Sequence, residues 1–412
     1  MLLLAALLLA GSCALSLSCS DSEEPHEGTH PESTTLPADI TPPPNAKALQ
    51  GVSAISAGAY HTCTLTDGGS AVCWGGNETG QLGDGTTADR ALAAPISGLG
   101  GEVTQVVTGF SSTCAITTPG ALLCWGRNDT GAIGDGTSEA MHTTPTQVLG
   151  LGADVREVAV GREHACAVTT GKVWCWGDNT FGQLGAETAE QQQSTPVEVV
   201  GLSGDVVSIG LGWYHTCILT ASDQVMCWGN NQTAQLGSGS GAVSQSNRPI
   251  AIEGLPSGIV SLAVGGGHNC VLTEAGAVVC WGANNYGQTG DGTTTDRPTA
   301  IQVEGLGGEA AAIAAGTGQS CALLRSGAVM CWGHDWYGEL GDGTNGEGNN
   351  KLQPVELLGV TGNAAAIAMG RFHTCILTDA GGVQCVGRNG FGDLGDGTRM
   401  LRLAPVRVLE AP

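Results

Sequence analysis

The sequence lacks several features that would point to common functions. It has only three lysines, and 15 Lys and Arg face 38 Asp and Glu, which gives a formal net charge of −23. Nucleic-acid binding requires clustered Lys and Arg, so this charge argues against a phosphate-binding surface and favours a basic or neutral partner. No Ser-His-Asp arrangement, phosphate-binding loop or paired-carboxylate site stands out. The 67 glycines follow no G-X-Y period, which indicates many tight turns rather than collagen.

The N-terminus carries an apolar run that is too short to cross a membrane comfortably. Residues 1–12, MLLLAALLLAGS, are placed like the apolar core of a signal peptide. Cys13 and Cys19 both follow segments that resemble the lipobox of bacterial lipoproteins, in which the cysteine is acylated. We predict lipidation at Cys19, because the polar segment starts at the next residue. Cys13 is the alternative site, and an ordinary cleaved signal peptide is the alternative to lipidation.

A polar segment follows the apolar run. Residues 20–45 carry six acidic residues, no Lys or Arg, and three consecutive prolines. Such a segment cannot bury enough apolar surface to offset its ordering entropy, so we expect an extended tether. The predicted organisation is a signal peptide with lipobox over residues 1–19, a disordered acidic linker over 20–47, and one repeat domain over 48–412.

The rest of the chain is built from seven copies of one unit. The first copy is GAYHTCTLTDGGSAVCWGGNETGQLGDGT, residues 58–86. Its first cysteine recurs every 51 to 54 residues, at Cys63, Cys114, Cys166, Cys217, Cys270, Cys321 and Cys375. A period of this size is typical of stacked or radial supersecondary units, each too small to bury its own apolar face.

Each unit contains two cysteines on a predicted hairpin. A three-residue turn at residues 67–69 places Cys63 opposite Cys73. In the third unit Cys166 and Cys175 are one residue closer, and the turn is one residue shorter, so they still face each other. In an exported protein this predicts seven disulfides. The pairs are Cys63–Cys73, Cys114–Cys124, Cys166–Cys175, Cys217–Cys227, Cys270–Cys280, Cys321–Cys331 and Cys375–Cys385. A zinc site formed by His61 and two cysteines is the alternative, but structural zinc needs a fourth ligand.

Four strands per unit are predicted. A short run bounded by glycine precedes each hairpin, at residues 52–55, 103–106, 155–158, 206–209, 259–262, 310–313 and 364–367. A strand led by proline follows it, at Pro95, Pro145, Pro196, Pro249, Pro298, Pro354 and Pro405. Seven units of four antiparallel strands predict an all-β, seven-bladed β-propeller. We expect the C-terminal strand, residues 405–408, to complete the first blade and close the ring.

The repeat GxxHxCxLxxxGxVxCWGxNxxGQLGDGT, followed by a proline strand, resembles that of the regulator of chromosome condensation family. The resemblance covers about residues 51–408 and implies a seven-bladed propeller. Ser112 and Gln319 depart from it at the histidine, Val386 at the tryptophan, and Asp335 at the asparagine. The founding member is a nuclear guanine-nucleotide exchange factor that binds chromatin. Another member, secreted by bacteria, inhibits β-lactamases through one face of the ring.

The positions that vary between units predict the functional face. The two residues after the glycine of Gly-x-x-His differ in every unit, and several are aromatic or arginine, the residues that dominate interface hot spots. With two residues from the loop after Trp-Gly, the candidates are Tyr60, Phe110, Arg162, Trp213, Tyr214, Trp336, Tyr337, Arg371 and Phe372. The alternative is that these aromatics plug the tops of the blades.

Residues that recur in most units are expected to be structural. The histidines at 61, 164, 215, 268 and 373 should make hydrogen bonds between strands or blades, and the tryptophans should pack in the core. The aspartates of the Asp-Gly-Thr loops, such as Asp84 and Asp291, could bind calcium, but turn capping is commoner.

We therefore expect an exported bacterial protein in the periplasm, or at the outer membrane or cell surface as a lipoprotein. It is predicted to be a monomer that binds an unidentified protein or cell-envelope component, without cofactor, metal or catalytic activity. One alternative is a guanine-nucleotide exchange factor for a small GTPase, which the family resemblance implies. Another is a glycan-acting enzyme of the cell envelope, which should show clustered acids at one mouth of the channel.

Overall fold

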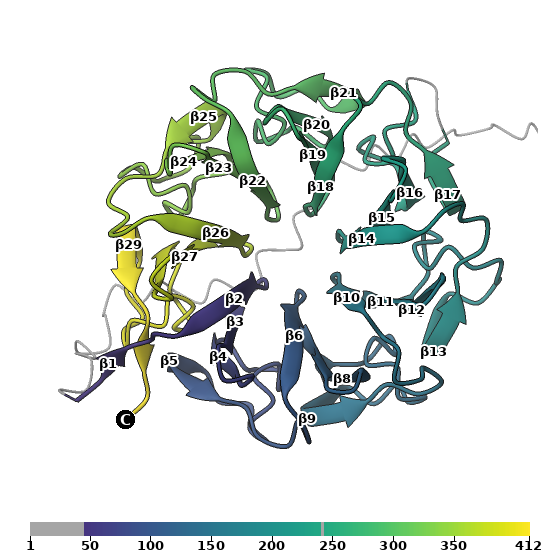
Figure 1. Ribbon diagram of the computed structural model, residues 1–412, viewed down its shortest axis with the longest axis horizontal. Helices are drawn as coiled ribbons and strands as arrows, with labels where there is room; N and C mark the ends of the chain where they lie inside the picture. Colours follow the sequence, from purple (N-terminus) through teal and green to yellow (C-terminus); the bar gives the residue numbers. More distant parts are fainter. Residues whose placement is uncertain (1–44, 240–242) are drawn as a thin grey trace, which may run out of the picture. The chain divides into compact units, whose positions relative to one another are not determined.

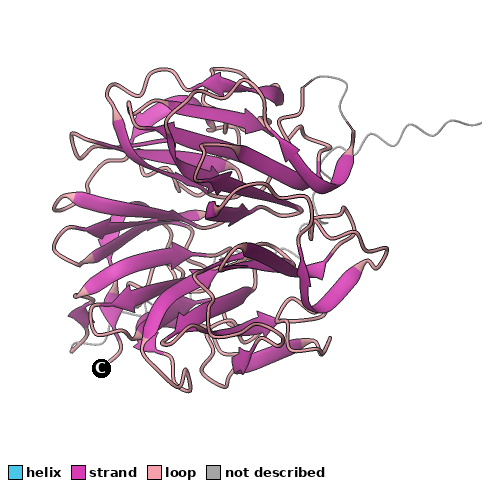
Figure 2. Ribbon diagram, turned by 45° about the vertical axis from the view of Figure 1, so that its right-hand side comes forward, coloured by secondary structure: helices cyan, strands magenta, loops and turns pink. Residues whose placement is uncertain are grey.

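The computed structural model describes residues 45–239 and 243–412. All regular structure in these residues is β, as the colouring of Figure 2 shows. Within these ranges there is no helix with the length and apolar character needed to cross a bilayer. The predicted lipidation sites Cys13 and Cys19 lie outside the described residues, together with the linker up to residue 44.

Seven blades of four antiparallel strands stand around a common axis, and two short strands extend the sheet of blade 1 to six; this confirms the predicted seven-bladed propeller (Figure 1). Blades 1 to 4 are β2 (Val52–Ala57), β3 (His61–Thr66), β4 (Ala71–Gly75), β5 (Arg90–Pro95); β6 (Val103–Thr108), β7 (Ser112–Thr117), β8 (Ala121–Arg127), β9 (Met141–Gln147); β10 (Glu157–Val160), β11 (His164–Thr169), β12 (Lys172–Asp178), β13 (Gln192–Glu198); and β14 (Val206–Leu211), β15 (His215–Thr220), β16 (Val225–Asn230), β17 (Gln245–Ala251). Blades 5 to 7 are β18 (Ile259–Val264), β19 (His268–Thr273), β20 (Val278–Gly282), β21 (Arg297–Gln302); β22 (Ala310–Ala315), β23 (Gln319–Leu324), β24 (Val329–Gly333), β25 (Lys351–Glu356); and β26 (Ala364–Met369), β27 (His373–Thr378), β28 (Val383–Gly387), β29 (Arg402–Arg407).

The hairpin of each blade has the predicted register. Cys63 lies opposite Cys73, and Cys166 lies opposite Cys175 despite the shorter turn. All seven predicted pairs are disulfide-bonded. Each pair is buried in the core between blades, so the disulfides fasten hairpins that the sheet already brings together.

The core is divided among the seven interfaces between neighbouring blades. Each interface has its own apolar cluster, including one between the last blade and the first. Six of the clusters contain a fully buried tryptophan, and blade 7 has Val386 at that position. Trp125 Nε1 donates a hydrogen bond of 2.9 Å to the Gln81 carbonyl of the preceding blade, and the other tryptophans repeat this contact. The predicted packing role of the tryptophans is confirmed, and each one also fastens its blade to the neighbour.

The C-terminus closes the ring, but not through the residues that the sequence suggested. Residues 405–408 largely belong to β29, which pairs with β28 as the outer strand of blade 7. The closing strand is β30 (Leu409–Glu410), which lies parallel to β5 of blade 1 and antiparallel to β1 (Lys47–Ala48). Leu49 and Val408 are buried beside these strands, between blades 7 and 1. The two ends of the domain are therefore joined by main-chain pairing and by shared core.

Two smaller expectations need correction. The prolines lie within or at the end of the outer strands rather than at their start; Pro95, for example, is the last residue of β5. An outer strand pairs along one side only in most blades, so the missing N–H costs no ladder bond on the other side. In the third unit the ladder begins at Glu157, two residues later than predicted.

Candidate functional site

Two kinds of loop meet at one end of the ring axis. In blade 1 the loop between β2 and β3 begins at Gly58, where an added Cβ would lie 2.2 Å from the Gly109 carbonyl oxygen of blade 2. That close approach requires glycine. The Phe110 amide donates in turn to the Gly161 carbonyl of blade 3 at 3.1 Å. These links hold the residues after each glycine beside the inner strands, which lie nearest the axis (Figure 1).

The loop after each Trp-Gly emerges at the same end, as the sequence predicts. The Gly76 amide donates to the Tyr60 carbonyl at 2.7 Å, and the rings of Tyr60 and Phe391 contact each other with centroids 5.4 Å apart. Both loops therefore contribute side chains to one face.

Eight of the nine predicted residues form a continuous set of stacked contacts, together with Arg388 and Phe391. We name this set the arginine–aromatic belt: Tyr60, Phe110, Arg162, Trp213, Tyr214, Tyr337, Arg371, Phe372, Arg388 and Phe391. The Arg162 guanidinium lies 5.0 Å from the Phe110 ring centroid and 5.4 Å from that of Trp213. Arg371 of blade 7 lies 5.4 Å from the same Phe110 ring in blade 2. All ten side chains are half-buried, so they pack against one another and still reach solvent.

Trp336 joins the belt only indirectly. Its ring and that of Tyr286 each lie 4.9 Å from the His334 ring, which is 5.5 Å from Phe372. An added Cβ at Gly318 would come within 2.9 Å of the Tyr286 ring, so this tyrosine covers the bare glycine of blade 6. His334 and Arg388 were not predicted as candidates, although they occupy equivalent positions after the Trp-Gly of blade 6 and the Val-Gly of blade 7. The residue at that position varies between units. The criterion applied to the Gly-x-x-His loop, variation between units, would therefore also have selected it.

Two arginines of this face have carboxylate neighbours. Arg127 Nε donates to Asp129 at 2.9 Å, and Arg162 Nε lies 3.9 Å from Glu163. Burial raises the pKa of Glu163, and the two guanidiniums lower it by less. Blades 2 and 3 therefore have their own negative charge at the face.

Arg371 and Arg388 differ from these two. Neither forms an ion pair within 4.0 Å with any described carboxylate. Arg371 Nη1 donates to the Tyr60 hydroxyl, but its buried Nε makes no hydrogen bond. Arg388 Nη1 is likewise buried without a hydrogen bond. The two guanidiniums lie 5.7 and 5.2 Å from the Tyr60 ring centroid, so two positive charges flank one aromatic ring.

Two buried acids support the belt loops of blades 6 and 7. Glu339 Oε2 accepts the Tyr337 amide at 2.8 Å, and its Oε1 contacts His334 Nδ1. Asp393 Oδ2 accepts the Phe391 amide at 3.2 Å. In four other blades a glutamine makes the equivalent bond. The loops that display the belt are thus held by side chains as well as by the sheet.

The recurring histidines are structural, as predicted. Each Nε2 lies 2.8 to 3.0 Å from a Thr, Ser or Asn side chain of the following blade. Burial lowers the pKa of His61, His164, His268 and His373 to about 3 and that of His215 to about 4. Neutral imidazoles in these positions fasten the blades together, and they are too deeply buried to contact a ligand.

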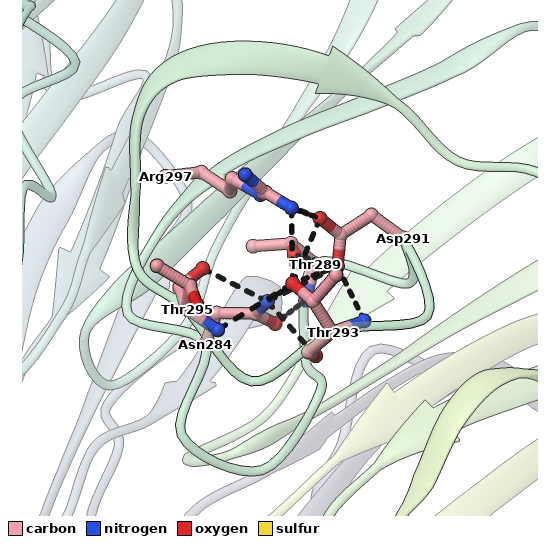
Figure 3. Close-up of polar contacts among 6 residues, drawn as sticks. All are labelled: Asn284, Thr289, Asp291, Thr293, Thr295 and Arg297. Carbon is pink, nitrogen blue, oxygen red and sulfur yellow. Dashed lines mark hydrogen bonds and ion pairs between the residues drawn. The ribbon is translucent and has the colours of Figure 1, made fainter.

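The Asp-Gly-Thr loops are capped turns. Figure 3 shows that Asp291 accepts the Thr293 amide at 3.0 Å and the Asn284 side chain at 3.1 Å, and that it pairs with Arg297. Burial would raise the pKa of Asp291, but the hydrogen bonds from Thr293, Arg297 and Asn284 lower it below its usual value. With these partners the carboxylate oxygens are already occupied. No group of three or more metal-ligating side chains occurs in the described part of the chain.

Comparison with known proteins relates this chain to proteins that contain regulator of chromosome condensation repeats. Residues 92–411 match the RCC1-like domain family, and residues 52–81 match the regulator of chromosome condensation (RCC1) repeat. The ultraviolet-B receptor UVR8 of Arabidopsis thaliana is 29% identical over 90% of this chain and 84% of its own length. The human probable E3 ubiquitin-protein ligase HERC4 is 31% identical over 82% of this chain, which spans only 32% of that protein.

A third relative is the secretion-regulating guanine nucleotide exchange factor of Bos taurus, 31% identical over 81% of this chain and 77% of its own length. Among solved structures, human WBSCR16 superposes with a TM-score of 0.73 at 22% identity, covering 82% of this chain and 94% of the other. The structural likeness at this identity bears on the fold alone.

Proposed function

The chain belongs to the RCC1-like domain family, and from this premise we propose that it is an exported propeller that binds a partner protein through the arginine–aromatic belt. Family membership predicts the fold better than the function, so the support for this function comes from the residues of the site. A propeller of this family serves as an interaction module, and the belt residues occupy positions that differ from blade to blade.

The belt carries the proposal. It gathers aromatic and arginine side chains at one mouth of a rigid ring, and these residue types contribute most of the energy at protein interfaces. The side chains are half-buried, so they are pre-positioned and lose little conformational entropy when a partner docks. The strands and buried histidines do not need them, because blades 5 and 6 carry Gly266 and Thr317 at equivalent positions.

The place of action is argued from the cysteines and the N-terminus. Seven disulfides favour an oxidising compartment. The apolar residues 1–12 followed by Cys13 or Cys19 support export and a lipid anchor. Metabolic labelling with a lipid precursor tests the anchor: Cys19→Ser should lose the label and Cys13→Ser should keep it. Labelling of both variants would contradict the proposed anchor.

The binding face is tested by recovering partners from a cell-envelope extract. The test variant is Trp213→Ala with Tyr214→Ala, and the control is Val207→Ala with Val260→Ala. Val207 is the second residue of the inner strand that Trp213 follows, so it lies at the opposite end of the same blade, and its side chain is 53% exposed. We expect the test variant to lose the partner that wild type and control retain. Recovery of the same partner by all three proteins would refute this face.

Nucleotide exchange on a small GTPase is the second candidate. One observation favours it: the Bos taurus exchange factor aligns with most of the chain at 31% identity. Accelerated nucleotide release from a small GTPase would support it. The belt gives no support to a glycan-acting enzyme, because its described ionisable groups are arginines and tyrosines rather than clustered acids.

A further inference from the structure

We propose that Arg371 and Arg388 bind a carboxylate of an acidic segment in the partner protein, with an aromatic side chain of that segment packed on the belt. This inference rests on the proposed function, since it names the chemistry recognised at the same face. It goes further by identifying two residues and one ligand group.

The first argument is the contrast with most other positive charges of the described chain; Lys47, Arg156 and Arg407 form no ion pair there either, but they are exposed. Arg90, Arg297, Arg402 and Lys351 each pair with the aspartate of an Asp-Gly-Thr loop. Arg325 pairs with Glu309. In so acidic a chain, two half-buried guanidiniums that form no ion pair with a carboxylate of residues 45–239 or 243–412 are an exception. Both lie in blade 7, and both contact Tyr60 of blade 1.

The second argument concerns desolvation. Stacking on aromatic rings uses the flat face of a guanidinium and leaves its N–H groups unsatisfied. Arg371 Nε and Arg388 Nη1 are buried from solvent and make no hydrogen bond. A half-buried guanidinium without a counter-ion is costly, and a carboxylate placed on its solvent-facing N–H groups supplies the opposite charge and strong acceptors, often through two parallel bonds.

The third argument distinguishes among anions. The net charge of −23 opposes the approach of a polyanion such as a nucleic acid. A single carboxylate carries less charge, and the rings of Phe110 and Phe372, which flank Arg371, offer apolar contact to a neighbouring side chain. A peptide that combines acidic and aromatic residues fits both features.

Asp393 is the internal competitor for Arg388. It is almost fully buried, and its Oδ1 makes no hydrogen bond. Burial raises the pKa of Asp393 to about 6, and the nearby Arg388 lowers it by less. If Arg388 served only to neutralise this acid, then replacing both residues together would restore the behaviour of the wild type.

The test uses a fluorescently labelled peptide of alternating Asp and Phe, and its Asn and Phe counterpart, with binding to the full chain followed by fluorescence anisotropy. We expect the acidic peptide to bind and the amide peptide to bind about tenfold or more weakly, because charge-assisted hydrogen bonds are lost. This comparison uses the wild-type protein and does not depend on the folding of any variant. Affinity for the acidic peptide should also fall as salt is added.

The variants assign the effect to residues. Arg371→Gln and Arg388→Gln should each weaken binding of the acidic peptide about tenfold or more. Arg325→Gln is the matched control, since Arg325 follows β23 at the end of the blade opposite to the belt, and it should bind like wild type. Wild-type affinity in the double variant Arg388→Gln with Asp393→Asn would overturn the role of Arg388.

Three results would overturn the inference. These are equal binding of the acidic and amide peptides, a Kd weaker than about 1 mM for the acidic peptide, and tighter binding of a phosphoserine counterpart, which would replace carboxylate by phosphate. Equal binding that is lost in the Trp213→Ala and Tyr214→Ala variant would leave the proposed function standing and refute only the carboxylate. Recovery of the same partner by the wild type and by the Trp213→Ala and Tyr214→Ala variant would refute the proposed function itself.

Discussion

The buried histidines give the sharpest prediction about stability. The pKa of His164 is lowered from 6.5 to about 3 by burial, and its Nε2 contacts Thr216 of the next blade. A group with a lower pKa in the folded state stabilises the fold at pH above its unfolded value. This contribution is lost as the pH falls from 6.5 toward 3. The perturbation is His164→Gln, since Gln319 occupies the same position in blade 6 and bonds the next blade at 3.0 Å.

The magnitude follows from the two pKa values. At pH 5 the unfolded histidine is almost fully protonated and the folded one is neutral. Each such histidine therefore lowers the free energy of unfolding by about 2 kcal/mol relative to pH 7.5. Five such histidines would cost about 10 kcal/mol. Three acids that are buried or half-buried, Glu157, Asp335 and Asp393, have pKa values raised to about 7, 7 and 6, so they stabilise the fold as the pH falls over the same interval. The comparison of two proteins that differ by one histidine removes this opposing contribution.

The assay is denaturant unfolding of wild type and His164→Gln at pH 7.5 and pH 5. Acidification should destabilise the wild type by about 2 kcal/mol more than the variant. The reverse substitution, Gln319→His, should add a similar loss. Equal losses in wild type and both variants would show that no neutral histidine is buried at these positions, and the reasoning would fail.

Three further predictions concern the ring. Deleting residues 409–412 removes β30, including the bond from Ala411 to Ala93, and should lower the free energy of unfolding by about 3 kcal/mol in denaturant melts; unchanged stability would contradict closure by this strand. Replacing Cys63 and Cys73 by alanine should cost about 2 to 3 kcal/mol while far-UV circular dichroism stays the same, because the bond closes only a local hairpin. Asp291→Asn should cost about 1 to 3 kcal/mol through its loop network, and a calcium-dependent melting temperature in the wild type would argue for a metal role instead.

Much of the fold could be predicted because it is local and repeated. The register of each hairpin follows from the turn length, which is why Cys166 and Cys175 could be paired despite their shorter spacing. Seven copies of the motif then specify seven blades. The role of the histidines and tryptophans was also predictable, since a residue needed in nearly every unit is needed by the packing.

Ring closure was predicted in outline and wrong in detail. Each unit already contains its own outer strand after Trp-Gly, so the strand at Pro405 belongs to blade 7 and none is left over. The strands that do close the ring, β1 and β30, have two residues each. Such short strands leave no alternating pattern in a sequence, and their pairing depends on a contact between the two ends of the domain.

The site was predicted in part for a similar reason. Variation within a strict repeat identified most of the belt, because positions that the fold does not need are free to differ. The stacking of Arg371 on Phe110 joins blade 7 to blade 2, and no local pattern indicates such a contact. Arg388 was missed because the variation criterion was applied to the loop before the histidine and not to the first position after Trp-Gly, although that position also varies between units.

Site-specific photocrosslinking tests the central claim most directly, because the chain has too few lysines for amine crosslinkers to map a surface. Benzoylphenylalanine is placed at position 213 in the belt or at position 207 at the opposite end of the same blade. The protein is then irradiated in cell-envelope extract. We predict a covalent adduct with one partner protein from position 213 and none from position 207. An adduct from position 207 alone would contradict the account.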